Sequence, residues 1–163
     1  MTNTTLLLDD VDRRILNALQ QDASQTNSAL AQRVHVSAPT CLRRVKRLRD
    51  AGLIEREVAL LNIDKLAHIT GHGLTAIVEI TLDRQGDELI TAFEHRVQVD
   101  AAVQQCYRTS PGPDFVLIVH VVDMPAYLAL SQRLFTSDVN IRNVKAFFSI
   151  KRSKFEPKVL IAQ

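Results

Sequence analysis

Apolar positions recur at helical spacing through the first fifty residues of the chain. In the segment 10–22 they fall at Val11, Ile15, Leu16 and Leu19, which places them on one face of a helix. Two shorter segments continue this spacing, and their apolar positions are Leu30, Ala31 and Val34, followed by Cys41, Val45 and Leu48. The pattern predicts three short helices that share a small core.

Residues at the ends of these segments supply the start and stop signals of helices. Asp9 precedes the first segment, and either Thr26 or Asn27 precedes the second. Ser37 precedes the third, and Gly52 follows it where a helix commonly ends. The side-chain oxygens of such capping residues accept hydrogen bonds from the free N–H groups of a first turn. The boundaries therefore support the three predicted helices.

The third predicted helix, 37–50, is the most cationic part of the chain. With Arg33 just upstream, its basic residues are Arg43, Arg44, Lys46, Arg47 and Arg49. A basic face on a lone helix is more often a solvated surface than a nucleic-acid contact. Here the helix follows another one across a tight turn at His35-Val36 and precedes a possible wing. That arrangement is typical of a helix-turn-helix that binds double-stranded DNA.

The second helix of such a motif enters the major groove with its N-terminal half towards the bases. The residues expected near base edges or the nearest phosphates are Ser37, Ala38, Thr40 and Arg43. Those expected at the DNA backbone are Arg44, Arg47 and Arg49, with inward packing as the alternative for Arg44. The segment after Gly52, 53–63, is expected to form a strand or a short wing.

From Leu74 onward, strands alternate with helices. Strands are predicted at 74–82, 102–109, 114–122 and 144–153, and helices at 87–100 and 124–134. The order βαββαβ is that of a ferredoxin-like sandwich. We therefore predict an α+β protein in which a winged helix-turn-helix, 1–61, and a linker, 62–73, precede a ferredoxin-like domain, 74–163.

The predicted linker loses periodicity and contains Gly71 and Gly73. His68 and His72 have the i, i+4 spacing that can bind a metal ion when both lie on a helix with a third ligand nearby. The two glycines argue against a helix here. We therefore expect no metal site in this segment.

The strongest predicted strand, 114–122, has apolar side chains on both faces. In a βαββαβ sandwich the two helices cover only one face of the sheet. A monomer rarely leaves a large apolar patch exposed, so we expect the second face to be buried in a two-fold homodimer. Such a dimer places two helix-turn-helix units on one roughly palindromic duplex.

Composition and motifs narrow the remaining classes. The net charge of +2 is small, and the two cysteines, Cys41 and Cys106, have no CxxC partners. This favours reduced thiols over a disulfide framework or a zinc site. The sequence has neither a signal-peptide pattern nor an apolar run of about 18 residues, which indicates a cytoplasmic protein that does not enter membranes. GxGxxG, P-loop, GxSxG and HExxH motifs are absent, so we expect neither an enzyme nor a cofactor.

Two long stretches carry a family resemblance: LDDVDRRILNALQQD (8–22) and LAQRVHVSAPTCLRRVKRLRDAGLI (30–54). Together with the βαββαβ pattern they resemble the Lrp/AsnC (feast/famine) family of prokaryotic transcription regulators. The resemblance implies an N-terminal DNA-binding domain and a C-terminal domain for effector sensing and oligomerisation. It also implies dimers that assemble further, often into octamers, and that respond to amino acids or related small metabolites.

The resemblance extends to the turn between the second and third strands of the sensing domain. In the family this turn carries a Gly followed by Asp and lies near the effector site. The matching segment here is 110–115, and the resemblance implies effector contacts from Ser110, Gly112 and Asp114. Pro111 stands where the family usually has Gly, so the local backbone is expected to differ.

Two alternatives share many of these features. An architectural protein could bind DNA with little sequence preference. A small-molecule-binding ferredoxin-like protein without a DNA function is the other alternative, since the fold alone decides nothing.

Overall fold

The computed structural model describes residues 7–71 and 73–161. The chain divides into two compact units. The first comprises the chain up to Leu60 together with the segment from Lys154 onward, and the second runs from Leu61 to Ser153. The predicted ferredoxin-like domain extended to residue 163. The C-terminal segment instead packs with the N-terminal unit.

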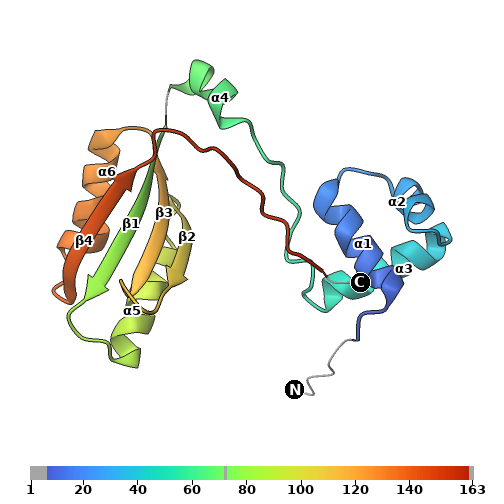
Figure 1. Ribbon diagram of the computed structural model, residues 1–163, viewed down its shortest axis with the longest axis horizontal. Coiled ribbons are helices and arrows are strands. Elements are labelled where there is room, and N and C mark those ends of the chain that lie inside the picture. The colour runs from blue at the N-terminus through green and yellow to red at the C-terminus, as the bar shows by residue number, and fades with distance from the viewer. Residues whose placement is uncertain (1–6, 72, 162–163) are drawn as a thin grey trace. The chain divides into compact units, whose positions relative to one another are not determined.

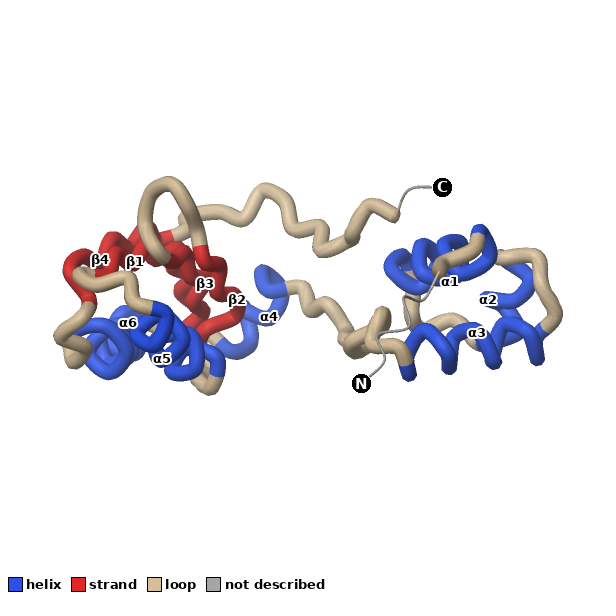
Figure 2. The backbone as a smooth tube through the Cα atoms, turned by 90° about the horizontal axis from the view of Figure 1, so that it is seen from below, coloured by secondary structure: helices blue, strands red, loops and turns tan. Residues whose placement is uncertain are grey.

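The first unit contains three helices, with the bounds α1 (Asp10–Gln21), α2 (Asn27–Arg33) and α3 (Ala38–Asp50) (Figures 1 and 2). The side chains of Asp9, Thr26 and Ser37 each accept a hydrogen bond from the backbone N–H three residues later, as predicted for caps. The predicted apolar seams meet in a core that includes Ile15, Leu16, Leu30, Ala31, Val34, Cys41, Val45 and Leu48.

The ends of α2 and α3 depend on left-handed backbone. His35, between the two helices, has a φ of 58°. Gly52 follows α3 with a φ of 72°, and its N–H donates to the carbonyl of Arg49 at 2.8 Å. Glycine adopts this conformation without the Cβ penalty, which confirms Gly52 as the stop of α3. A strand or a short wing was expected after it, and the strand is not formed: 53–62 has no regular secondary structure, because no described strand of the first unit pairs with it.

A short helix, α4 (Ile63–Thr70), lies in the predicted linker. The side chain of Asn62 caps its first turn, and the helix ends before Gly71, whose φ is 88°. The glycines were expected to argue against a helix here. Gly71 lies just after the last helical residue, so it ends α4 but does not stop the helix from forming. His68 lies in α4, but His72 lies outside the described residues, so the prediction about a metal at this pair remains untested.

The second unit contains a four-stranded antiparallel sheet of order β2-β3-β1-β4. Two helices, α5 and α6, cover the same face of it (Figure 2). The bounds are β1 (Leu74–Leu82), α5 (Asp87–Gln98), β2 (Val103–Arg108), β3 (Phe115–Val121), α6 (Met124–Ser131), a π-helical turn η1 (Gln132–Thr136) and β4 (Ile141–Phe148). The βαββαβ order is confirmed. The last strand begins and ends earlier than predicted, because Ile141 already pairs with Leu82 at the end of β1.

The two faces of the sheet differ in burial. Side chains that face α5 and α6 are buried, among them Ala76, Val78, Ile80, Phe115, Leu117 and Val119. On the other face, Ile77 pairs with Phe147 on one side and with Ile118 on the other. Ile77 and Phe147 are exposed and Ile118 is half-buried. The predicted apolar second face is therefore present.

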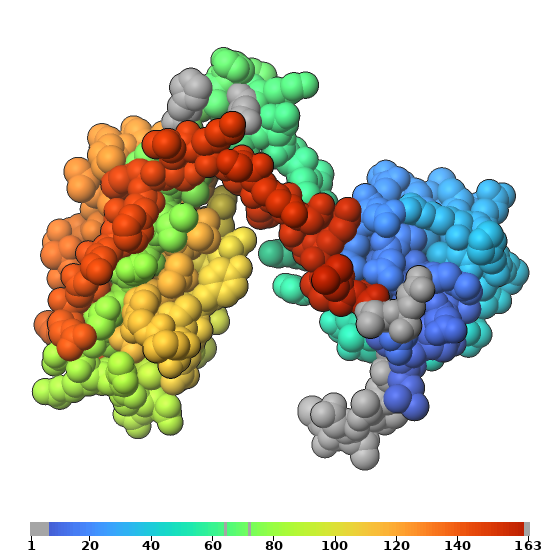
Figure 3. All heavy atoms as spheres, viewed as in Figure 1, coloured from blue at the N-terminus to red at the C-terminus, as the bar shows by residue number. Residues whose placement is uncertain are grey.

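The C-terminal segment, residues 154–161, is extended and lies against the first unit, where it is coloured red in Figure 3. The Gln20 side chain bonds the backbone of Val159 twice: its Nε2 donates to the carbonyl at 3.2 Å, and its Oε1 accepts from the N–H at 2.6 Å. Ile161 packs against the core of the three helices. This segment is therefore part of the N-terminal unit.

Candidate nucleic-acid interface

The basic residues of α3 fall into two groups that differ in ion pairing. Cys41, Val45 and Leu48 face the core, so the other side of the helix is turned outward. Arg43 and Lys46 are exposed there, and neither makes an ion pair within the described part of the chain. The other three basic residues of α3 are all ion-paired.

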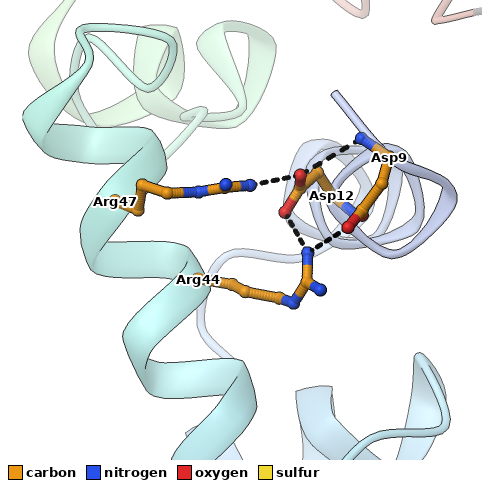
Figure 4. A network of polar contacts seen from close by, with 4 residues as sticks. All are labelled: Asp9, Asp12, Arg44 and Arg47. Carbon is orange, nitrogen blue, oxygen red and sulfur yellow. Dashed lines mark hydrogen bonds and ion pairs between the residues drawn. The ribbon is translucent and has the colours of Figure 1, made fainter. Parts of the chain in front are cut away.

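Two of them point at the beginning of α1 (Figure 4). Arg44 Nη1 lies 2.7 Å from Asp9 Oδ2 and 2.9 Å from Asp12 Oδ1, and the Arg47 guanidinium bonds Asp12 Oδ2. Asp12 is fully buried, with 0% of its side chain exposed. The inward alternative for Arg44 is therefore the one observed, and Arg47 shares the same acid.

Asp9 and Asp12 also cap the helix on which they lie. The N–H of Asp12 donates to Asp9 Oδ1 at 2.9 Å, and the N–H of Asp9 donates to Asp12 Oδ2 at 3.2 Å. The bond from the Asp12 N–H, followed by that from Arg44, lowers the pKa of Asp9 from 3.8 to about 2. Hydrogen bonds to the carboxylates of Asp9 and then Asp12 raise the pKa of Arg44. The start of α1 is thus tied to the middle of α3 by charged groups on both sides.

The third paired cation lies near the end of α3. Arg49 bonds the carboxylate of Glu57 in the segment that follows the helix. Both residues line an open hollow of about 380 Å³ together with Ile54, Glu55 and Arg56. Arg49 is therefore partly neutralised at the place where a backbone contact was expected.

The N-terminal end of α3 holds the remaining predicted contacts. Ser37 Oγ accepts from the Thr40 N–H at 3.4 Å and donates to Thr40 Oγ1 at 2.9 Å. Ala38 is half-buried, and its carbonyl accepts from Asn27 Nδ2 at 2.9 Å. These bonds fix the first turn of α3, and Ser37 remains exposed beside it.

In the second unit, the three predicted effector residues lie together. Ser110, Gly112 and Asp114 line a cavity of about 240 Å³, whose other lining residues are Gln85, Ile90, Arg108, Thr109 and Phe115. Asp114 Oδ2 accepts from the Leu82 N–H and its Oδ1 accepts from Gln85 Nε2, both at 2.7 Å. Asp114 therefore ties the turn to the end of β1.

The turn between β2 and β3 contains a glycine with a positive φ. Gly112 has a φ of 126°, so the glycine conformation occurs one residue after Pro111. Sequence reasoning did not include Arg108 or Gln85 in this site, because nothing in their local spacing marks them. They reach the turn from the end of β2 and from the loop after β1.

Sequence reasoning also left Lys46 out of the DNA-contact set, and it assigned no tertiary contact to Asp12. The position of Asp12, three residues after Asp9, is typical of a capping pair. Its pairing with α3 is a tertiary contact that this spacing does not show. Within the described residues, no helix is long and apolar enough to cross a membrane, and no three His, Cys, Asp or Glu side chains gather in a metal-binding group.

Comparisons with known proteins match both units. A winged helix-turn-helix DNA-binding model matches residues 8–55, and an Lrp/AsnC ligand binding domain model matches residues 75–159. The leucine-responsive regulatory protein of Escherichia coli (strain K12) is 40% identical over 76% of this chain and 73% of its own length.

Solved structures agree over nearly the whole chain. An AsnC family transcriptional regulator from Agrobacterium tumefaciens has a TM-score of 0.81 and 31% identity, covering 94% of this chain and 97% of its own. A transcriptional regulator from Neisseria meningitidis in complex with L-Met has a TM-score of 0.81 and 27% identity with the same coverage. These relatives are transcription regulators and not enzymes. The chain therefore belongs to the Lrp/AsnC family, as a DNA-binding transcription regulator that joins a winged helix-turn-helix to a ligand-binding domain.

Proposed function

We propose that this regulator binds specific DNA sequences through the exposed face of α3, with Arg43 and Lys46 as its main cationic contacts. The observation that carries the proposal is the difference in ion pairing along the helix. Arg44 and Arg47 are held by buried Asp12, whereas exposed Arg43 and Lys46 make no ion pair among the described residues. A cation that an acid already neutralises gains less from a phosphate than one in water does.

Base selection is assigned to the N-terminal half of α3. Arg43 can donate two hydrogen bonds to the O6 and N7 atoms of a guanine. Ser37, Ala38 and Thr40 lie at the end of the helix that enters the groove in this motif. Arg49 lies in the last turn of the helix, where a backbone contact competes with its bond to Glu57.

Selection of bound sequences from a random library, followed by titrations on the selected and random duplexes at matched salt, tests the proposal. Arg43→Ala is expected to cost about 1–3 kcal/mol on the selected duplex and less on the random one. Lys46→Ala is expected to weaken both alike. Lys65→Ala, which removes a cation from α4, is the charge control and should change neither. Equal affinity of the unaltered protein for both duplexes would support the architectural alternative and contradict this proposal.

We also propose that an amino acid or a related small metabolite binds at the turn between β2 and β3 and modulates DNA binding in the cytoplasm. The cavity bordered by Ser110, Gly112 and Asp114 supports this, as do the names of two relatives, one leucine-responsive and one bound to L-Met. A thermal-shift screen of the twenty amino acids tests it. A ligand at 100 times its Kd stabilises the protein by about 2.7 kcal/mol. No shift with any of them would contradict an amino-acid effector.

For assembly, we propose a homodimer formed through the second face of the sheet, with further association of dimers up to an octamer. The exposed side chains of Ile77, Tyr107 and Phe147 on that face support the dimer. Burying such a patch against its copy removes apolar area from water at about 25 cal/mol per Å². Sedimentation at micromolar concentration distinguishes the states, and a stable monomer would contradict the proposal.

A further inference from the structure

Leu42 is an unusual residue on the surface of α3. The helix has two other large apolar side chains, Val45 and Leu48, and both are buried in the core of the first unit. Leu42 instead has 60% of its surface exposed. Single exposed leucines are common on proteins, so exposure alone carries no meaning. Its surroundings distinguish it.

Leu42 lies within the cationic patch that the proposed function assigns to DNA. On a helix, residues four apart lie one above the other. Leu42 therefore lies between Ala38, one turn earlier, and Lys46, one turn later, and Arg43 is its neighbour along the chain. The apolar side chain is thus bordered by the two α3 cations that make no ion pair within the described residues.

The charges beside Leu42 indicate what can cover it. An apolar protein surface placed on this patch would take Arg43 and Lys46 out of water without supplying them with opposite charge, which is costly. A DNA major groove supplies phosphates to both cations. It also presents one apolar group at the base edges, the 5-methyl group of thymine, and apolar side chains contact that methyl group.

We infer that Leu42 contacts the 5-methyl group of a thymine and thereby contributes to the choice of DNA sequence. The inference rests on the proposed function, in that α3 must lie in the major groove. It adds a specific base preference that the cations alone do not provide. Lys46 helps to position the helix, Arg43 contacts its own base, and Leu42 favours thymine over cytosine at the base pair that it faces.

Replacing thymines by deoxyuridine tests this, because the two bases differ only by the methyl group. The sequence selected by the unaltered protein is resynthesised with each thymine replaced in turn, and the full-length protein is titrated on every duplex. At least one replacement is expected to weaken binding by about fourfold, the effect of one buried methyl group. In Leu42→Ala the same replacement should have little effect, while Leu42→Met should retain most of it.

Leu60→Ala is the matched control, because Leu60 is 64% exposed in the same unit but lies off the helix. It should leave the ratio of affinities for the two duplexes unchanged. Thermal melts of all variants verify that the fold is intact. The inference is overturned if no replacement weakens binding, or if the effect persists in Leu42→Ala. In both cases a selected sequence would still exist and the proposed function would stand. Failure to select any sequence would overturn both.

Discussion

Asp12 is fully buried, and its two carboxylate oxygens bond to Arg44 and Arg47 of another helix. Removing a carboxylate from water is costly unless opposite charges and hydrogen bonds compensate it. Both arginines and the N–H of Asp9 provide this compensation. One acid at the start of α1 therefore pairs with two of the five basic residues of α3.

Asp12→Asn tests this role through stability. The amide removes the charge and leaves Arg44 with one acidic partner, so the first unit should lose about 3 kcal/mol. Urea unfolding followed by far-ultraviolet circular dichroism measures the loss. Asp50→Asn, at an exposed acid of α3, should change stability by less than about 0.5 kcal/mol. Equal stability of the two variants would contradict the role given to Asp12.

Fluorescence adds an internal reference to the same experiment. The chain has no Trp, and its two tyrosines, Tyr107 and Tyr127, both belong to the second unit. Their signal should therefore keep its midpoint in Asp12→Asn. If only the tyrosine midpoint shifted, the destabilisation would lie in the second unit, which would contradict the role given to Asp12.

The lowered pKa of Asp9 predicts a dependence of stability on pH. Because its pKa falls from 3.8 to about 2 on folding, ionised Asp9 stabilises the folded state above about pH 4. This contribution is lost as the pH falls from about 4 through 2. About half of the side chain is exposed, so solvent screening keeps the effect small.

Asp9→Asn isolates this contribution, because asparagine is an equally good cap but carries no charge. The stability difference between the unaltered protein and the variant should be constant above about pH 4 and shrink towards pH 2. Urea midpoints measured across that range give the difference. A constant difference down to pH 2 would mean that Asp9 has an ordinary pKa in the folded protein.

At the scale of elements, the segment 154–161 is the least expected part of the first unit. Deleting residues 154–163 should lower the stability of the three helices by about 1–2 kcal/mol, because Ile161 leaves their core and Gln20 loses two bonds. Circular dichroism should show the change while the tyrosine midpoint stays fixed. Gln20→Ala should show a smaller loss, and Lys158→Ala, a surface control, almost none.

The sequence predicts elements well where local chemistry determines them. The caps Asp9, Thr26 and Ser37 and the stop at Gly52 are visible along the chain because a helix end needs those side chains or that backbone conformation. Alternation in β3 likewise predicts one buried face. These features depend on residues only a few positions apart.

Features that depend on distant residues were missed or misjudged. The pairing of Arg47 with Asp12, the docking of Ile161 and the lining of a cavity by Arg108 join residues far apart in the sequence. The segment after Gly52 has the composition of a strand, but without a neighbouring strand its N–H and C=O groups have no ladder to join. Local pattern therefore predicts the cationic helix α3, but not which of its basic residues form ion pairs.

At the scale of the whole molecule, the proposed dimer gives the open face of the sheet a role in DNA binding. Phe147→Asp places a charge among the apolar side chains of this open face, where Phe147 is 52% exposed and pairs with Ile77. Burying that charge in the dimer is unfavourable, so sedimentation should show monomers. DNA affinity should fall at least tenfold, because two linked helix-turn-helix units bind more tightly than one.

Val139→Asp provides the control for this variant. Val139 is fully exposed in the loop before β4 and lies outside the sheet. It should leave both the sedimentation and the DNA affinity unchanged. If Phe147→Asp sediments like the unaltered protein, the dimer does not form through this face.

The internal pairing of Arg44, Arg47 and Arg49 has a consequence for the ions around DNA. Each phosphate that a protein cation neutralises releases about 0.9 counterion from the duplex. Through Arg43 and Lys46, each copy of α3 should release about two counterions, whereas five unpaired cations would release about 4.5. In plots of log affinity against log salt, Arg43→Ala should reduce the slope by about 1 and Arg44→Ala hardly at all. The affinity of a regulator with few unpaired cations therefore falls less steeply when the salt concentration inside the cell rises.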